Sequence, residues 1–365
     1  MNGLHHSDVE WMAEALVAAK RGFGKVGPNP MVGAVIVKNG ECIAVGAHTK
    51  FGGPHAEIVA LRKAGLAAHG AMMYVTLEPC CHFGKTPPCT DAIIKAGIVK
   101  VVGAIQDPNP LVMGRGYNAL KKAGIEVVDG VCREQAQALN TSNFKHVVSG
   151  LPYVIVKIAQ TIDGKIATIT GSSQWITGEQ SRKFVHQLRA SVDAVVVGIG
   201  TILADDPLLN VRLVNGPDPM RIIIDSHFRT PPTAKLLSTP APVLICGIAG
   251  QHPARQIALK KAGAEVVELS GTDEHVGLHD VLRHASTIGV HRILVEGGRD
   301  VATAFLRARL ADELIVAIAP KLIGSDGRDG FGTLGVVSIE QAIEFDHTVI
   351  ERFGNDVHLR LQVKQ

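Results

Sequence analysis

Three metal-binding side chains and one carboxylic acid stand at a spacing that suits hydrolytic chemistry. His55 and Glu57 are separated by one alanine, Cys80 follows Pro79, and Cys89 comes nine residues after Cys80. One imidazole and two thiolates supply three ligands for tetrahedral zinc and leave the fourth position for water. Zinc lowers the pKa of that water, and Glu57 is placed to carry its proton to a leaving amine. This pattern is typical of zinc-dependent nucleobase deaminases.

The spacing departs from the usual deaminase pattern, in which two residues separate the cysteines. Here eight residues, CHFGKTPP, stand between Cys80 and Cys89. Cys81 and His82 are therefore rival ligands that spacing alone does not dismiss. The competing hypothesis is a closed structural zinc site made by Cys80, Cys81, His82 and Cys89, which would not depend on Glu57.

Two glycine turns in the second half of the chain are candidates for phosphate binding. They are GIGTILADDP (residues 198–207) and VEGGRD (residues 295–300), and each follows an expected strand. Such a turn exposes backbone N–H groups at a helix N-terminus, and Arg299 adds a positive charge. Neither turn completes Gly-x-Gly-x-x-Gly, so a standard dinucleotide-binding domain is not predicted.

The elements that must position these residues fall into two groups. In the first group, Ser7 and Glu10 form a capping box that begins a helix. Strands are then expected at 31–37, 42–47, 72–76, 100–105 and 125–128, and helices at 56–64, 90–96, 117–123 and 133–143. In the second, strands are expected at 153–159, 194–197, 221–225, 243–246, 265–269, 292–295 and 314–319, and helices at 179–190, 254–262, 278–288 and 301–309. This alternation favours an α/β fold with a largely parallel sheet covered by helices.

The break Gly150-Leu151-Pro152 predicts the boundary between the two groups. We expect domains at residues 1–148 and 151–365, and a chain of 365 residues is long enough for two cores.

Bulk composition narrows the class of protein. The net charge is +3 and aromatic residues make up 4%, which argues against a nucleic-acid partner. Three of the six cysteines lie between residues 80 and 89, as in a metal site rather than a disulfide scaffold. No signal peptide or membrane-spanning apolar run is visible, so we expect a cytoplasmic protein without a membrane partner.

The first half carries the resemblance to a known family. TLEPCCHFGKTPPC (76–89), PNPMVGA (28–34) and GGPHAE (52–57) resemble the deaminase domain of the bacterial bifunctional riboflavin biosynthesis protein family. That family deaminates diaminohydroxyphosphoribosylaminopyrimidine, and its long insert between the cysteines matches the departure noted above. The resemblance implies a cytidine-deaminase-like α/β/α domain. In it one zinc ion is bound by His55, Cys80 and Cys89, protons are moved by Glu57, and substrate is contacted by Asn29, His48 and Lys85.

The second half resembles the reductase of the same family. The matching stretches are KIAQTIDGKIA (157–167), QWIT (174–177), VGIGT (197–201), DDP (205–207) and EGG (296–298). The resemblance implies a dihydrofolate-reductase-like α/β domain in which NADPH reduces the ribosyl group to ribityl. Expected NADPH contacts are Ala159, Trp175, Thr201, Asp205, Ser226, Gly298, Arg299, Asp300, Val301, Ala302 and Thr303. Expected substrate contacts are Ser173, Arg189, Leu209, Arg212 and Glu296.

Two residues of the second half are candidates for the reaction itself. Lys157 and Asp205 suit proton transfer or polarisation of the substrate. The family also implies a phosphorylated pyrimidine as the small-molecule substrate and a homo-oligomer. Two other functions are kept as alternatives: a nucleoside or nucleic-acid zinc deaminase with an unrelated C-terminal domain, and a deaminase whose reductase is inactive.

Overall fold

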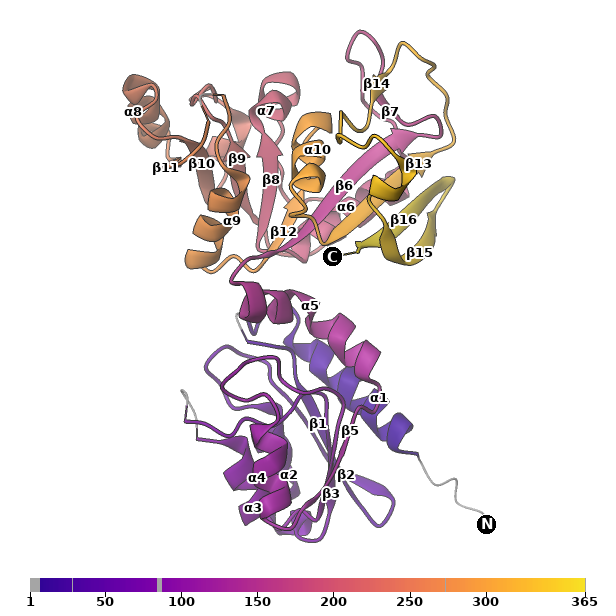
Figure 1. Ribbon diagram of the computed structural model, residues 1–365. Helices are drawn as coiled ribbons and strands as arrows, with labels where there is room; N and C mark the ends of the chain where they lie inside the picture. The colour runs from indigo at the N-terminus through magenta and orange to yellow at the C-terminus, as the bar shows by residue number, and fades with distance from the viewer. Residues whose placement is uncertain (1–6, 28, 84–86, 273, 365) are drawn as a thin grey trace. The chain divides into compact units, whose positions relative to one another are not determined.

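The computed structural model describes residues 7–27, 29–83, 87–272 and 274–364, and these form two compact units (Figure 1). Unit 1 runs to Gly150 and unit 2 starts at Leu151. The division lies inside the expected break Gly150-Leu151-Pro152. Gly150 ends the last helix of unit 1 with a φ of 71°, a left-handed conformation that glycine adopts without strain.

Unit 1 contains a five-stranded sheet in the order β2-β1-β3-β4-β5. The strands are β1 (Gly33–Lys38), β2 (Glu41–Ala47), β3 (Met72–Val75), β4 (Lys100–Gly103) and β5 (Glu126–Asp129). β1 pairs antiparallel with β2 and β3, whereas β3, β4 and β5 run parallel. The carboxyl ends of β3 and β4 therefore open on the same edge of the sheet, where ligands are bound in such folds.

Helices cover both faces of this sheet. They are α1 (Asp8–Ala19), α2 (Ala56–Ala64), α3 (Cys89–Lys95), α4 (Arg115–Lys122) and α5 (Arg133–Ser149), with short 3₁₀ turns η1 (Lys20–Gly22) and η2 (Gly65–Ala68). α1 begins with the expected capping box of Ser7 and Glu10. In Figure 1, α1 and α5 lie on one side of the sheet and α2, α3 and α4 on the other.

Two glycines let α1 and α2 approach the sheet closely. A Cβ on Gly33 would lie 2.0 Å from the Ala15 carbonyl oxygen of α1, and one on Gly46 would lie 2.1 Å from the Ala56 oxygen of α2. Ala34 is the partner of Gly46 in the β1–β2 ladder, so Gly33 and Gly46 face opposite sides of the sheet. The position of α2, which carries His55 at its start, therefore depends on the missing side chain of Gly46.

The last helix of unit 1 is tied to the segment before β1. Asn140 is 2% exposed and interrupts α5 with non-helical angles. Its side chain pairs with Met31 like a neighbouring strand: Oδ1 accepts from the Met31 N–H at 2.8 Å, and Nδ2 donates to the Met31 carbonyl at 2.9 Å. This clamp fixes the chain immediately beyond Asn29 and Pro30.

Unit 2 contains a nine-stranded sheet among the described residues, in the order β11-β10-β9-β8-β12-β6-β13-β16-β15. All pairs from β11 to β13 are parallel, and β16 and β15 add an antiparallel hairpin. The strands are β6 (Tyr153–Thr161), β8 (Ala194–Gly198), β9 (Met220–Ile224), β10 (Val243–Ile248), β11 (Glu265–Leu269), β12 (Arg292–Val295), β13 (Glu313–Ala319), β15 (Phe345–Phe353) and β16 (Asp356–Val363).

The central strand β6 separates two apolar cores. Val154, Val156 and Ile158 pack on one side of the sheet with α9 and α10, and Tyr153 and Ile155 pack on the other with α6, α7 and α8. The helices are α6 (Glu179–Ala190), α7 (Ile199–Asp205), α8 (Pro253–Lys261), α9 (Leu278–Thr287) and α10 (Arg299–Arg307), and the 3₁₀ turns are η3 (Lys235–Ser238) and η4 (Ile339–Gln341). The side-chain period of two along a strand places Lys157 on the α6 side.

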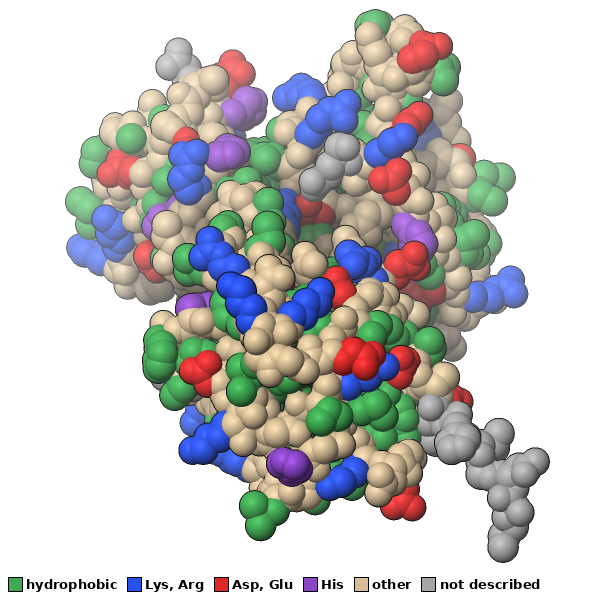
Figure 2. All heavy atoms as spheres, turned by 60° about the horizontal axis from the view of Figure 1, so that its bottom comes forward, with side chains coloured by type: hydrophobic (Ala, Val, Ile, Leu, Met, Phe, Trp, Pro, Cys, Tyr) green, Lys and Arg blue, Asp and Glu red, His purple; other side chains and the backbone are tan. Residues whose placement is uncertain are grey.

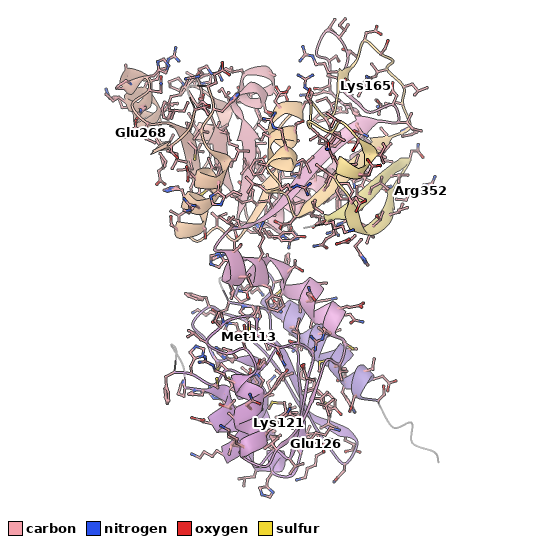
Figure 3. All side chains as sticks on the ribbon, viewed as in Figure 1. Met113, Lys121, Glu126, Lys165, Glu268 and Arg352 are labelled. Carbon is pink, nitrogen blue, oxygen red and sulfur yellow. The ribbon has the colours of Figure 1, made fainter. Side chains whose placement is uncertain are left out.

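A two-stranded ribbon of β7 (Lys165–Ala167) and β14 (Arg328–Asp329) stands beside the large sheet. Lys165, labelled in Figure 3, forms an ion pair with Asp329 across it. The predicted α/β class and the largely parallel sheet are confirmed, while α7, this ribbon and the C-terminal hairpin were not expected.

Candidate active sites

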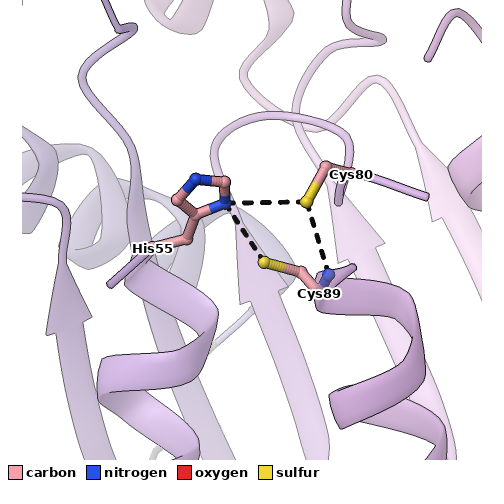
Figure 4. Close-up of side chains that lie close together, drawn as sticks. All are labelled: His55, Cys80 and Cys89. Carbon is pink, nitrogen blue, oxygen red and sulfur yellow. Dashed lines mark hydrogen bonds between the residues drawn. The ribbon is translucent and has the colours of Figure 1, made fainter. Parts of the chain in front are cut away.

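The three expected metal ligands of unit 1 lie together (Figure 4). His55 is the residue before α2, Cys89 is the first residue of α3, and Cys80 lies on the loop after β3. His55 Nδ1 is 3.6 Å from Cys80 Sγ and 3.2 Å from Cys89 Sγ, and all three ligand atoms lie within 4.8 Å of one another. One imidazole and two thiols at these separations fit the donor set of a zinc ion.

The hydrogen bond between the two thiols favours a thiolate at Cys80 and raises the pKa of Cys89. A hydrogen bond from Cys89 lowers the pKa of Cys80 to about 4, and His55 acts in the same direction. The backbone N–H of Cys89 also donates to Cys80 Sγ at 3.3 Å. A sulfur held as thiolate in this way is ready to bind a metal ion.

The closed structural site is not formed by the described residues. The Cys81 side chain turns away and donates to the Leu111 carbonyl at 3.9 Å, and the metal-binding cluster contains neither Cys81 nor His82. The cluster therefore has three protein ligands, as an open, reactive zinc site requires.

Glu57 lies beside the cluster in the first turn of α2 and is 3% exposed. Its Oε2 is buried without a hydrogen-bond partner among the described residues. Burial raises the pKa of Glu57 to about 6, while the neighbouring His55 lowers it. A carboxylate with one unpaired buried oxygen is prepared for a partner that comes with the ligand.

Asn29 and His48 form part of a pocket of about 280 Å³ that also includes His55, Glu57 and Cys80. His48 Nδ1 lies 3.0 Å from the Pro54 carbonyl, which can only accept, so Nδ1 carries the proton. His48 Nε2 then accepts from Asn29 Nδ2 at 3.1 Å. Burial lowers the pKa of His48, in keeping with this neutral form. The arrangement leaves the amide oxygen of Asn29 as a free acceptor.

The pocket is also lined by Glu78, Asp107 and Asn109, which the sequence did not single out, and by His82, which was expected only as a rival zinc ligand. Burial raises the pKa of Asp107, and its side chain accepts from the Asn109 N–H at 2.9 Å. The turn Asp107-Pro108-Asn109-Pro110, which follows a buried strand, was the sequence signal that could have identified Asp107 and Asn109. Lys85, the third expected substrate contact, lies outside the described residues.

Unit 2 has a larger cavity, of about 940 Å³, at the carboxyl ends of β6, β8 and β12. Its lining brings together thirteen of the expected reductase residues: Lys157, Ala159, Ser173, Trp175, Arg189, Thr201, Asp205, Arg212, Glu296, Gly298, Arg299, Asp300 and Val301. Both glycine turns reach it as starts of helices, Gly198 before α7 and Gly298 before α10.

A buried ion pair stands in the wall of this cavity. Arg189 donates from Nε and Nη2 to the two carboxylate oxygens of Glu296 at 2.6 and 2.8 Å, and from Nη1 to the Asn210 carbonyl at 3.0 Å. Burial lowers the pKa of Lys157, the Glu296 charge raises it, and the Arg189 charge lowers it. The edge of Arg189 formed by Nε and Nη2 is thus already held by Glu296.

Four expected contacts do not line the cavity. Leu209 and Ala302 are buried in apolar cores. Ser226 is 7% exposed, and its Oγ accepts from the Val276 N–H at 3.0 Å. Thr303 Oγ1 donates to the Arg299 carbonyl at 2.6 Å and accepts from the Gly332 N–H at 2.8 Å.

Comparison with known families matches both halves of the chain. Residues 5–105 match the family described as cytidine and deoxycytidylate deaminase zinc-binding region. Residues 152–359 match the family described as RibD C-terminal domain. The hypothesis of a deaminase with an unrelated C-terminal domain is therefore wrong.

Relatives of known function align along almost the whole chain. The riboflavin biosynthesis protein RibD of Aquifex aeolicus is 45% identical, over 96% of this chain and 97% of its own length. RibD of Escherichia coli is 42% identical, over 97% of this chain and 99% of its own length.

Solved structures agree with this assignment. RibD of Acinetobacter baumannii superposes with a TM-score of 0.86 at 41% identity and covers 98% of this chain and 99% of its own. A diaminohydroxyphosphoribosylaminopyrimidine deaminase/5-amino-6-(5-phosphoribosylamino)uracil reductase of Thermotoga maritima gives 0.84 at 36% identity, with 99% of each chain covered. The expected cytidine-deaminase-like and dihydrofolate-reductase-like folds are confirmed by these matches. The chain belongs to the RibD family of bifunctional riboflavin biosynthesis enzymes, which join a zinc-dependent deaminase to a reductase.

Proposed function

We propose that unit 1 deaminates 2,5-diamino-6-(5-phosphoribosylamino)pyrimidin-4-one and that unit 2 reduces the ribosyl group of the product, 5-amino-6-(5-phosphoribosylamino)uracil, to ribityl. The observation that carries this proposal is the open cluster of His55, Cys80 and Cys89 with the buried, unpaired Glu57 oxygen beside it. We also propose domain limits of 1–148 and 151–365, and the compact units at 1–150 and 151–365 support them.

His55, Cys80 and Cys89 would hold one zinc ion, which when bound supplies a Lewis acid that activates water. Glu57 holds and moves the proton. Its unpaired Oε2 accepts the proton that the attacking water loses and returns it to the amine that leaves. The buried position of Glu57 keeps bulk water from competing for this proton.

Asn29 and His48 would orient the pyrimidine. His48 holds the Asn29 amide with its oxygen free to accept, which suits an N–H or amino group of the ring. Lys85 is proposed as the third substrate contact from the family resemblance.

In unit 2 the bound cofactor would be NADPH, which supplies the hydride. Its proposed contacts on the cavity wall are Ala159, Trp175, Thr201, Asp205, Gly298, Arg299, Asp300 and Val301. The proposed substrate contacts on the same wall are Ser173, Arg189, Arg212 and Glu296. Ser226, Leu209, Ala302 and Thr303 remain proposed contacts from the resemblance alone.

Lys157 and Asp205 are the proposed proton-transfer groups of the reductase, and both line its cavity. Burial lowers the pKa of Lys157, which makes its Nζ a more ready proton donor to an oxygen or nitrogen of the substrate.

We further propose a cytoplasmic homo-oligomer that binds no nucleic acid. Two free thiols among the zinc ligands suit a reducing compartment. Charges of both signs are interspersed on the face shown in Figure 2, unlike a continuous basic surface for nucleic acid. No described helix is long and apolar enough to span a membrane.

To test this proposal, zinc-loaded enzyme is incubated with the diaminopyrimidine substrate, and the release of ammonia and the oxidation of NADPH are measured. Ammonia release is expected without NADPH, and NADPH oxidation only after deamination. Glu57→Gln should stop ammonia release while zinc content stays at wild type, and Glu14→Gln, which changes an exposed carboxylate of α1, should change neither. Zinc retention without ammonia release in the wild type would refute the deaminase assignment.

A further inference from the structure

One histidine in the reductase cavity has no role assigned so far. His186 lies on α6, one turn before Arg189, and lines the cavity beside Arg212 and Glu296. It is only 3% exposed. A histidine that lines a ligand cavity can present a ring nitrogen to the ligand.

The tautomer of His186 is set by the backbone. The N–H of Arg212 points at His186 Nδ1 at 3.1 Å. A backbone N–H only donates, so Nδ1 must be the acceptor and cannot carry a proton. The proton of the neutral ring is therefore on Nε2, which has no hydrogen-bond partner within the described part of the chain.

The surrounding charges keep this ring neutral. Burial lowers the pKa of His186 to about 4, the charges of Arg189 and Arg212 act in the same direction, and Glu296 and Asp218 oppose them. At neutral pH the ring thus offers one N–H and no charge.

The same wall offers a cation without a matching carboxylate. Arg189 is neutralised by its two-point contact with Glu296. Arg212 donates to the Asn210 side-chain oxygen at 3.1 Å and takes part in no ion pair found between described side chains. A free guanidinium next to a fixed N–H donor is suited to an anionic oxygen. The part of 5-amino-6-(5-phosphoribosylamino)uracil that carries a full negative charge is its phosphate.

We propose that His186 is a substrate-binding residue of the reductase, donating from Nε2 to a phosphate oxygen of the ribosyl phosphate while Arg212 supplies the positive charge. This inference rests on the proposed reductase function. It makes the Arg212 backbone a positioning group, since that N–H fixes which nitrogen of His186 faces the ligand.

Two substitutions separate the two nitrogens. In His186→Asn, the amide oxygen can still accept from the Arg212 N–H, but the donor at Nε2 is lost. In His186→Gln, the longer amide reaches the position of Nε2 and can donate there, but the acceptor for Arg212 is lost. The matched control is His279→Asn, which changes an exposed histidine of α9.

The full-length enzyme is assayed for NADPH oxidation with 5-amino-6-(5-phosphoribosylamino)uracil and with the same compound after removal of its phosphate. His186→Asn should raise the KM for the phosphorylated substrate roughly tenfold or more, as expected for one hydrogen bond to a charged group. The KM for the dephosphorylated compound, the KM for NADPH and the rate of ammonia release should stay at wild type. His186→Gln should recover part of the affinity.

Three results would overturn the inference. The first is an unchanged KM for the phosphorylated substrate in His186→Asn, and the second is an equal increase in KM with both substrates. The third is a greater loss of affinity in His186→Gln than in His186→Asn, because it would show that the ring only holds the Arg212 backbone. Failure of the proposed function is distinct: the wild-type enzyme would then not oxidise NADPH with the phosphorylated substrate.

Discussion

The ion pair of Arg189 and Glu296 offers the sharpest test of how the reductase cavity is built. The change is Glu296→Gln, which keeps the shape of the side chain and removes its charge. One amide oxygen can still accept from Arg189, but the second of the two contacts, at 2.6 and 2.8 Å, becomes an N–H facing an N–H. Both side chains are about one-tenth exposed, at 11% and 10%, so water cannot replace the lost charge.

The size of the effect follows from this burial. Removing one partner of a buried ion pair costs about 3–5 kcal/mol, and we expect about 3 kcal/mol because one hydrogen bond survives. Lys157 adds to the loss, since the Glu296 charge stabilises its protonated form. For a unit of this size about 3 kcal/mol corresponds to a melting temperature lower by roughly 6–12 °C.

Calorimetry of the full chain is the assay, because unit 1 then serves as an internal reference. The transition of unit 2 should shift and that of unit 1 should not. Arg189→Gln and the double variant complete the cycle, and the double variant should be at least about 1 kcal/mol more stable than the sum of the single effects predicts. A loss below about 1 kcal/mol in Glu296→Gln, or additive effects, would refute the account of a tightly coupled buried pair.

Three shorter predictions concern other parts of the molecule. His358 is 0% exposed, and burial is the main cause that lowers its pKa to about 4, so the unfolded chain takes up a proton first as the pH falls below about 6.5. The stabilisation from this group is complete at pH 7 and about 2 kcal/mol smaller at pH 5. From pH 7 to pH 5 the free energy of unfolding, measured with urea, should therefore fall by about 2 kcal/mol less in His358→Gln than in wild type. In Gly46→Ala the new Cβ would meet the Ala56 carbonyl oxygen at 2.1 Å, so α2 must shift; we expect a loss of about 1–3 kcal/mol and reduced zinc content by metal analysis. Cys81→Ser should retain one zinc per chain, whereas Cys80→Ser should lower zinc affinity at least tenfold in a chelator competition.

Each of these has its own control. His279→Gln, at an exposed position, should show the wild-type pH dependence of stability. Gly27→Ala, where an added Cβ meets nothing within 4 Å, should leave zinc content and stability unchanged. An equal loss of zinc in the Cys81 and Cys80 variants would contradict the three-ligand cluster.

The sequence was most informative where one local pattern decides the structure. The amphipathic stretches at 56–64 and 179–190 became α2 and α6 with the same bounds, and the expected strands at 265–269 and 292–295 became β11 and β12. The hairpin of β15 and β16 was missed although its signal was present. Gly354, with a φ of 67°, and Asn355 form a two-residue loop between two strands in which polar and apolar residues alternate.

Contacts within the two sites were harder to predict, because they join residues that are distant in the sequence. The zinc ligands could be named because their types and order are rare, but the sequence could not show that Cys81 turns toward the Leu111 carbonyl. His186 gave no signal, since one histidine on an amphipathic helix is common, and only the Arg212 backbone beside it reveals its tautomer. Likewise, the pairing of Arg189 with Glu296 joins residues more than a hundred positions apart.

The clamp between Asn140 and Met31 bears on how the two activities can be separated. The family match for the deaminase ends at residue 105, yet the substrate pocket also takes Asp107 and Asn109, and the chain beside Asn29 is held by a helix that runs to Ser149. A gene shortened to the matched region would encode the zinc ligands without the helix that holds Met31, beside Asn29 and Pro30, in place. A free-standing deaminase derived from this protein must therefore retain the sequence up to the end of α5, so the natural point for splitting the gene is the codon of Gly150.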